Sequence, residues 1–184
     1  MRLETITVLP LGGIEQDVLA GITNGLEKVY GSFNFSILPA KQTPLFSLDR
    51  WRNQYRSDMI LEFLEWQMEG RVLAVTDSDL YAPRLNFVFG QAELGGKVAL
   101  VSIKRLDPIF YGEPSNPQLL LERAVKECVH ELGHTFGLDH CTNTNCVMSF
   151  SNSIADVDKK SGNLCESCRA KFKASFNSST EVVR

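Results

Sequence analysis

Every histidine of this 184-residue chain lies in one short segment, from His130 to His140. His130 and His134 are four residues apart, and an α-helix turns about 100° per residue, so both would project from one helix face. Gly137 follows where glycine can adopt the left-handed conformation that ends a helix, which would let the chain turn and bring His140 back. Three imidazoles suit zinc and leave a fourth position for water. The spacing therefore predicts a catalytic zinc site.

Glu131 adds a carboxylate to this predicted site. It follows His130 directly but is angled away from the two helical histidines, so it can reach a zinc-bound water without ligating the metal. Zinc lowers the pKa of such a water to about 7, and a nearby carboxylate can accept its proton during attack on a carbonyl. The same carboxyl group can then protonate a leaving amine. This chemistry predicts hydrolysis of a peptide or related amide bond, with Glu131 as the general base.

One long helix, beginning at Pro117, must position these groups. Its apolar residues fall on one line opposite the histidines, and this line predicts a core-facing side: Leu121, Val125, Cys128 and Leu132. The other side presents the ligands to a cleft. Glu127 shares the histidine-bearing side, where a solvated charge is expected. Cys128 is expected to be a buried, inert thiol.

The remainder of the chain before this helix alternates between predicted strands and helices. Strands are expected at residues 3–9, 33–38 and 71–76, and helices at residues 16–30 and about 55–68. Two further strands, residues 86–91 and 97–103, flank Gly95-Gly96, which indicates a hairpin. This order predicts an α/β layered domain with a mixed, mostly parallel sheet and one reversed strand.

The histidine segment and its surroundings resemble the metzincin metalloproteases, whose motif is His-Glu-x-x-His-x-x-Gly-x-x-His followed by a methionine-bearing turn. Met148 is placed to supply that turn. A cysteine directly after the third histidine, a second five residues later and a final Cys-x-x-Cys make the pattern similar to the archaemetzincin branch, over residues 130–168. The segment between the third histidine and the methionine is shorter here than in many secreted metzincins.

The resemblance implies roles for individual residues. His130, His134 and His140 would hold a catalytic zinc, with Glu131 as general base and Met148 packed beneath the ligands. A structural zinc would be held by Cys141, Cys146, Cys165 and Cys168, giving two zinc ions per chain. The resemblance also implies that the reversed strand at residues 86–91 lies along the cleft, where an extended substrate could pair with it. A plain structural hairpin is the alternative for this strand.

The four cysteines favour a second zinc site independently, because two short pairs of thiols suit tetrahedral zinc. Two disulfides are the competing interpretation, and they would require an oxidising compartment. The first residues, with Glu4 and Pro10, do not resemble a signal peptide, so we favour the four-thiolate site and expect a cytoplasmic protein.

Length and charge agree with a small enzyme. We expect one domain over residues 1–176, divided into an N-terminal subdomain (1–137) and a zinc-stapled C-terminal subdomain (138–176), with a flexible tail at 177–184. A net charge of −3 gives no reason to expect nucleic acid or an anionic membrane as partner, and no apolar run is long enough to span a bilayer. A monomer is the simplest expectation.

The function that these patterns predict is a zinc-dependent metallopeptidase acting on peptides or proteins. A non-catalytic zinc module that binds peptides or a partner protein through the same cleft is the alternative. Glu131 favours the enzyme, since a binding site has no chemical need for a base beside the metal. An amidase acting on another substrate would use the same residues.

Overall fold

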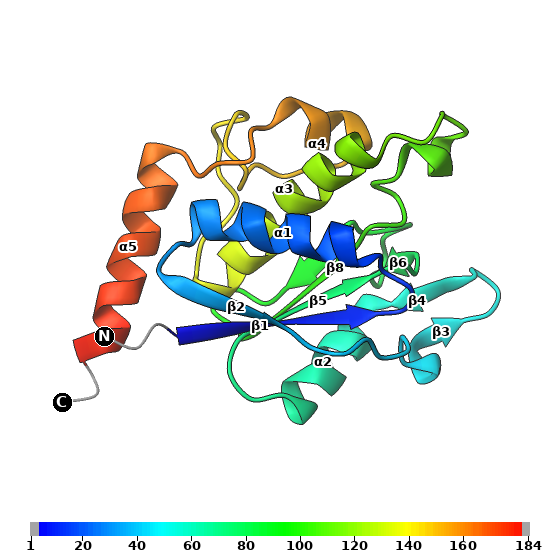
Figure 1. Ribbon diagram of the computed structural model, residues 1–184, viewed down its shortest axis with the longest axis horizontal. Coiled ribbons are helices and arrows are strands. Elements are labelled where there is room, and N and C mark those ends of the chain that lie inside the picture. The colour runs from blue at the N-terminus through cyan, green and yellow to red at the C-terminus, as the bar shows by residue number, and fades with distance from the viewer. Residues whose placement is uncertain (1–3, 182–184) are drawn as a thin grey trace.

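The computed structural model describes the main chain of residues 4–181 and the side chains of residues 4–175. Its centre is a five-stranded sheet in the order β2-β1-β5-β8-β7 (Figure 1). The first four strands are mutually parallel, and β7 is antiparallel to β8. Their bounds are β1 Glu4–Leu11, β2 Phe33–Ile37, β5 Val72–Thr76, β7 Gly90–Ala92 and β8 Val98–Ser102.

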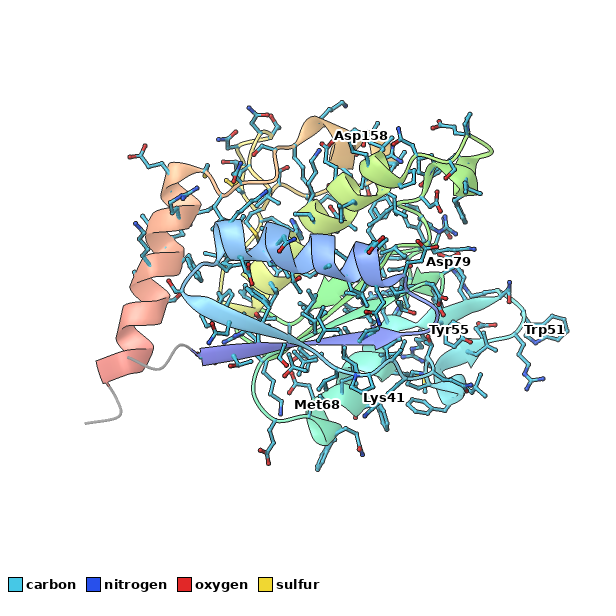
Figure 2. The ribbon with its side chains drawn as sticks, viewed as in Figure 1. Lys41, Trp51, Tyr55, Met68, Asp79 and Asp158 are labelled. Carbon is cyan, nitrogen blue, oxygen red and sulfur yellow. The ribbon has the colours of Figure 1, made fainter. Side chains whose placement is uncertain are left out.

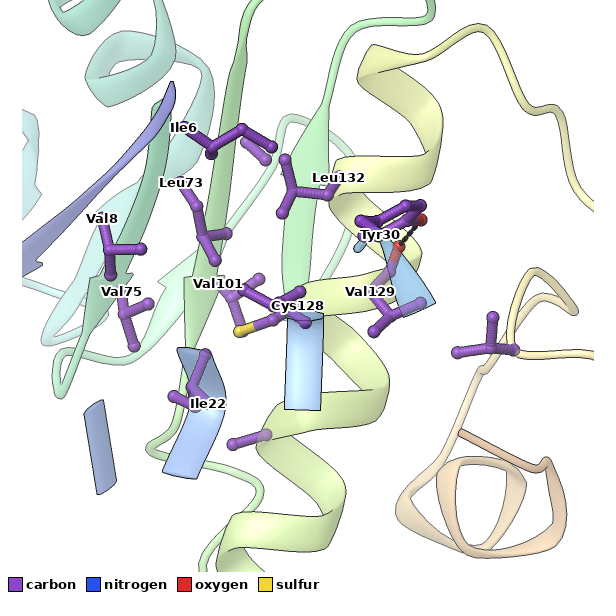
Figure 3. Close-up of a cluster of buried hydrophobic side chains, with 14 of the residues drawn as sticks. Ile6, Val8, Ile22, Tyr30, Leu73, Val75, Val101, Cys128, Val129 and Leu132 are labelled. Carbon is purple, nitrogen blue, oxygen red and sulfur yellow. Dashed lines mark hydrogen bonds between the residues drawn. The ribbon is translucent and has the colours of Figure 1, made fainter. Parts of the chain in front are cut away.

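Helices cover both faces of this sheet, so successive residues of its strands enter different cores. Ile6 and Val8 face α1 (Gln16–Val29) and α3 (Pro117–Thr135), whereas Leu9 and Leu11 face α2 (Ser57–Gln67). Figure 3 shows the first core, in which side chains of β1, β5 and β8 meet those of α1 and α3. The histidine-bearing helix α3 is thereby fixed against the sheet along its apolar side.

Helices α1 and α3 pack closely because α1 presents two glycines to α3. A methyl group at Gly21 would lie 2.6 Å from the Leu121 side chain, and one at Gly25 would lie 2.5 Å from that of Val125. Further along the same side of α3, Cys128 and Leu132 are fully buried. The predicted core-facing side of this helix is confirmed, as is the burial of the Cys128 thiol.

Shorter elements complete the chain. A second sheet contains β3 (Leu48–Asp49), β4 (Gln54–Arg56) and β6 (Leu80–Tyr81) in the order β3-β4-β6, and two 3₁₀ turns lie at Leu45–Ser47 and Pro108–Tyr111. After α3 come α4 (Ile154–Lys159) and α5 (Glu166–Glu181). Within the described residues, no helix combines the length and apolarity needed to cross a bilayer.

The predicted fold class, a mixed and mostly parallel α/β layered domain, is confirmed. One boundary prediction needs correction. The reversed strand expected at residues 86–91 is confined to Gly90–Ala92, because the side chains of Arg52 and Gln54 bind the carbonyl groups of Leu85 and Asn86. The main chain of the predicted tail is helical as far as Glu181. Leu3, expected to begin the first strand, lies outside the described residues.

Candidate active site and metal centres

The two helical histidines converge as their spacing predicts. The Nε2 atoms of His130 and His134 are 3.1 Å apart at the C-terminal end of α3. Each Nδ1 lies 2.8 Å from a main-chain carbonyl oxygen, that of Val147 for His130 and that of Leu138 for His134. A proton on Nδ1 can donate to these carbonyls, which leaves each Nε2 as a free acceptor. Metal-bound histidines are commonly oriented by this kind of hydrogen bond.

His140 returns to the other two through a tight turn. Gly137 has a φ of +81°, in the left-handed region expected for it, and α3 ends just before it, at Thr135. One ring nitrogen from each of the three histidines lies within 4.8 Å of the others. His140 is exposed, and its ring contacts that of Phe150 with 5.1 Å between centroids. The set of three imidazole nitrogens facing open space suits a catalytic zinc.

Met148, which was expected to pack beneath the ligands, is fully buried. It packs against Gly133, which sits between the two helical histidines; a methyl group there would overlap the Met148 sulfur. The same methyl group would lie 3.2 Å from the Tyr30 hydroxyl, which donates to the carbonyl of Val129 at 2.8 Å (Figure 3). Glycine at position 133 therefore lets α1 and the Met148 turn approach the helix from behind the histidines.

Glu131 lies between α3 and the edge of the sheet. It is 6 % exposed and packs against Gly90 of β7, where an added methyl group would lie 2.6 Å from its Cγ and 2.9 Å from Oε1. Burial, and secondly the negative charge of Glu127, raise the pKa of the Glu131 carboxyl well above its usual value. A carboxylate with a raised pKa is a stronger proton acceptor than one on the surface.

A buried ion pair lies behind His130 and was not expected from the sequence. The Nζ atom of Lys160 is 2.8 Å from Oε1 of Glu127, and both side chains are almost fully buried. Among the described side chains, Oε1 has no partner that meets hydrogen-bond geometry, although Lys160 lies within ion-pair distance. The expectation that Glu127 is solvated is wrong, because the segment after α4 folds over α3 and covers it. No spacing around Lys160 indicated this contact.

This ion pair also affects His130. Lys160 Nζ is 3.5 Å from its Nδ1. Burial of the imidazole, and secondly the positive charge of Lys160, lower the pKa of His130 well below its usual value. The ring is therefore held neutral, which is the form that binds metal.

The histidines open into a cavity of about 560 Å³. One wall is the segment from Ala82 through β7 to Ala92, and the other consists of α3 and residues 150–152. Ser102 N donates to Phe89 O, and hydrogen bonding alternates along an antiparallel pair, so Gly90 and Ala92 direct main-chain groups away from β8. In the described part of the chain, no other strand pairs with this edge, which lies beside the histidines. We call this cavity the cleft.

The four cysteines of the second predicted site also meet. Each offers a sulfur within 4.8 Å of the others, and Cys141 Sγ is 3.8 Å from Cys165 Sγ. Four Zn–S bonds of about 2.3 Å in a tetrahedron place sulfur atoms about 3.8 Å apart. All five cysteines are free. A hydrogen bond from the Cys168 main chain is the largest effect lowering the pKa of Cys165, to about 7, which favours the thiolate form that binds metal.

A histidine pair on a helix, a third histidine across a tight turn and a buried glutamate beside them define the class of zinc metallopeptidases. The family model described as Peptidase family M54 matches residues 19–174, and the chain belongs to this family. It is a zinc metallopeptidase with peptides or proteins as substrates.

Relatives and solved structures agree with this assignment. The chain is 45 % identical to the archaemetzincin of Methanocaldococcus jannaschii over 91 % of this chain and 92 % of that one. A crystal structure of the Methanopyrus kandleri archaemetzincin superposes with a TM-score of 0.84 at 37 % identity, covering 95 % and 96 % of the two chains. An Archaeoglobus fulgidus archaemetzincin complexed with malonate gives a TM-score of 0.79 at 40 % identity, over 91 % and 99 %. The resemblance to archaemetzincins is confirmed.

Proposed function

We propose that this protein hydrolyses peptide bonds at a zinc site formed by His130, His134 and His140, with Glu131 as the general base. The observation that carries the proposal is the placement of the Glu131 carboxyl group. It is buried between the histidine helix and the open edge of β7. An extended peptide would have to lie along that edge.

Zinc held by the three imidazoles would polarise the scissile carbonyl and make water a competent nucleophile near neutral pH. Glu131 would accept the proton of the attacking water and donate it to the leaving amine. The positive charge of a bound metal would lower the Glu131 pKa against the effect of burial, and would so keep the carboxylate able to accept a proton. The carbonyls of Val147 and Leu138 would hold the two helical imidazoles in the required tautomer.

We propose that Cys141, Cys146, Cys165 and Cys168 bind a second zinc ion with a structural role, which makes two zinc ions per chain. Four thiolates fill a tetrahedral site and leave no position for water or substrate. This site would join the turn that carries His140 to the start of α5. A cytoplasmic location and a monomeric state remain predictions.

The substrate would bind as an added strand along β7. Gly90 and Ala92 direct unpaired main-chain groups toward the cleft, and these can pair with the main chain of an extended peptide. The free edge is only three residues long, so the strand would orient the peptide over Glu131 without holding a long segment. Preference for particular side chains would have to come from other residues that line the cleft.

The test is cleavage of a diverse peptide pool by the zinc-loaded protein near neutral pH, beside Glu131→Ala and Glu131→Gln. We expect cleavage by the parent protein and a loss of at least about 100-fold in both variants, with the zinc content unchanged. Cleavage that persists equally in the variants would refute the role of Glu131. Peptides that bind to the parent protein without being cut would favour the non-catalytic binding module.

A further inference from the structure

One end of the cleft bears an arginine in an unfavourable backbone conformation. Arg84 lines the cleft and has a φ of +69°, in the left-handed region. It is the third residue of a turn with Pro83 at the second position, closed by a hydrogen bond from Leu85 N to Ala82 O. Turns of this kind favour glycine or asparagine at the third position. An arginine there costs stability, and such costs concentrate at functional sites.

Beside this turn lies the tip of the β3–β4 hairpin, residues 50–53. Trp51 is fully exposed, and Figure 2 shows it projecting from the end of the hairpin, away from the body of the protein. The guanidinium group of Arg52 donates to the carbonyls of Leu85 (3.2 Å) and Asn86 (2.9 Å), which line the cleft. The tip is therefore tied directly to one end of the cleft. We call Arg50, Trp51, Arg52 and Arg84 together the cationic rim.

The cationic rim carries charge that the described residues do not neutralise. Arg50, Arg52 and Arg84 form no ion pair with any residue whose side chain the structure describes. Asp49 is the nearby carboxylate, and it accepts hydrogen bonds from the main chain of Trp51 and Arg52. Asp79 is already paired with Arg105. Arg50 is two residues from Arg52 in the hairpin tip, and Arg84 adjoins Leu85, whose carbonyl accepts from Arg52. Three arginine residues therefore lie at or next to this contact, in a chain whose net charge is −3.

We propose that the cationic rim is an exosite, a binding surface outside the reacting centre, for an acidic segment of the substrate chain. This inference rests on the proposed function, because the segment would continue from the residues held along β7. Guanidinium groups bind carboxylates in a planar, bidentate manner, and an exposed tryptophan adds apolar contact area. An anionic membrane has similar charge, but the rim is continuous with a cleft that receives peptide. That continuity favours a polypeptide.

The test measures binding to the zinc-loaded Glu131→Gln protein, which cannot cut the probe. The probes are fluorescein-labelled peptides with one cleavable core and three Glu or three Gln residues on one flank or the other. With the three charged residues on one particular flank, we expect the Glu peptide to bind at least about fivefold more tightly than the Gln peptide. On the other flank the two peptides should bind equally. The ratio of the two affinities should shrink as salt is raised. In Arg50→Gln/Arg84→Gln the ratio should fall to about one, whereas Lys28→Gln, an exposed charge on α1, should leave it unchanged.

Two further variants separate binding from folding. Arg84→Gly removes the charge and relieves the strain of an L side chain in the left-handed region. This variant should be at least as stable as the parent while losing much of its preference for Glu over Gln peptides. Trp66→Phe leaves Trp51 as the single tryptophan of the chain, and its emission should shift with the Glu peptide. A shift with anionic phospholipid vesicles and none with the Glu peptide would overturn the proposal.

Other outcomes assign failure to one proposal or the other. Equal binding of Glu and Gln peptides, or a preference on both flanks that Lys28→Gln also weakens, would refute the exosite. If the parent protein, with Glu131 intact, still cuts the core peptide in that case, the proposed function stands. Flank-specific binding of Glu peptides without cleavage by the parent would uphold the exosite and refute the peptidase mechanism.

Discussion

The ammonium group of Lys160 lies 2.8 Å from the carboxylate of Glu127, and the pair is buried directly behind His130. Lys160 follows the last residue of α4, whereas Glu127 belongs to α3. The contact therefore fixes the segment after α4 to the helix that carries two histidines. Lys160 Nζ also lies 3.4 Å from the carbonyl of Ser149, in the turn that holds Met148. One side chain thus connects three segments around the histidine cluster.

Lys160→Met should destabilise the protein by about 3–5 kcal/mol, because it leaves Glu127 charged, buried and unpaired. Urea unfolding measures this change. The double variant Lys160→Met/Glu127→Gln should recover a large part of the loss, since neither charge then remains. If the double variant is as unstable as the sum of the two single variants, the pair does not act as a unit.

The histidine site was predictable because its ligands follow one helix and one turn, and both have a fixed period and a glycine signal. The four-cysteine site was predicted from a different signal, two short pairs of thiols whose spacing suits tetrahedral zinc. The contact between Lys160 and Glu127 was not predictable, since it forms only when distant segments fold together. A lysine in a charged stretch also carries no periodic signal. The short β7 strand was overestimated because side-chain hydrogen bonds from Arg52 and Gln54 compete with strand pairing at Asn86.

Gly90→Ala should lower kcat/KM by about 100-fold while leaving both zinc ions bound. The added methyl group would meet the Glu131 side chain and the carbonyl of Leu100, so either the base or β7 must shift, and small displacements of catalytic groups cost about that much. Peptide cleavage and metal analysis measure the two effects. Gly162→Ala is the control, since its methyl group meets no atom nearer than 3.9 Å. An active Gly90→Ala protein would show that the position of Glu131 tolerates displacement.

Cys165→Ser should reduce the zinc content from two ions to one and destabilise the protein by roughly 4 kcal/mol, as expected for the loss of a structural metal. Cys165 is the suitable ligand to change because it is distant in sequence from the histidines. Cys128→Ala is the matched control: Cys128 is buried in the core between α3 and the sheet, and its loss should leave both ions in place (Figure 3). Elemental analysis after dialysis counts the ions. A single zinc in the parent protein would contradict the second site.

Ala92→Pro should weaken cleavage of extended peptides by about 10-fold through an increase in KM, with a small effect on folding. Residue 92 is in the edge strand, and its N–H points away from β8, so proline removes a donor offered to the substrate and none used by the sheet. Ala92→Val keeps the N–H and serves as the control for side-chain size. Each hydrogen bond between substrate and enzyme contributes about 1 kcal/mol, which sets the expected size of the effect. Unchanged kinetics for Ala92→Pro on extended peptides would mean that substrate does not pair with β7, and the free edge would then be a structural feature of the hairpin.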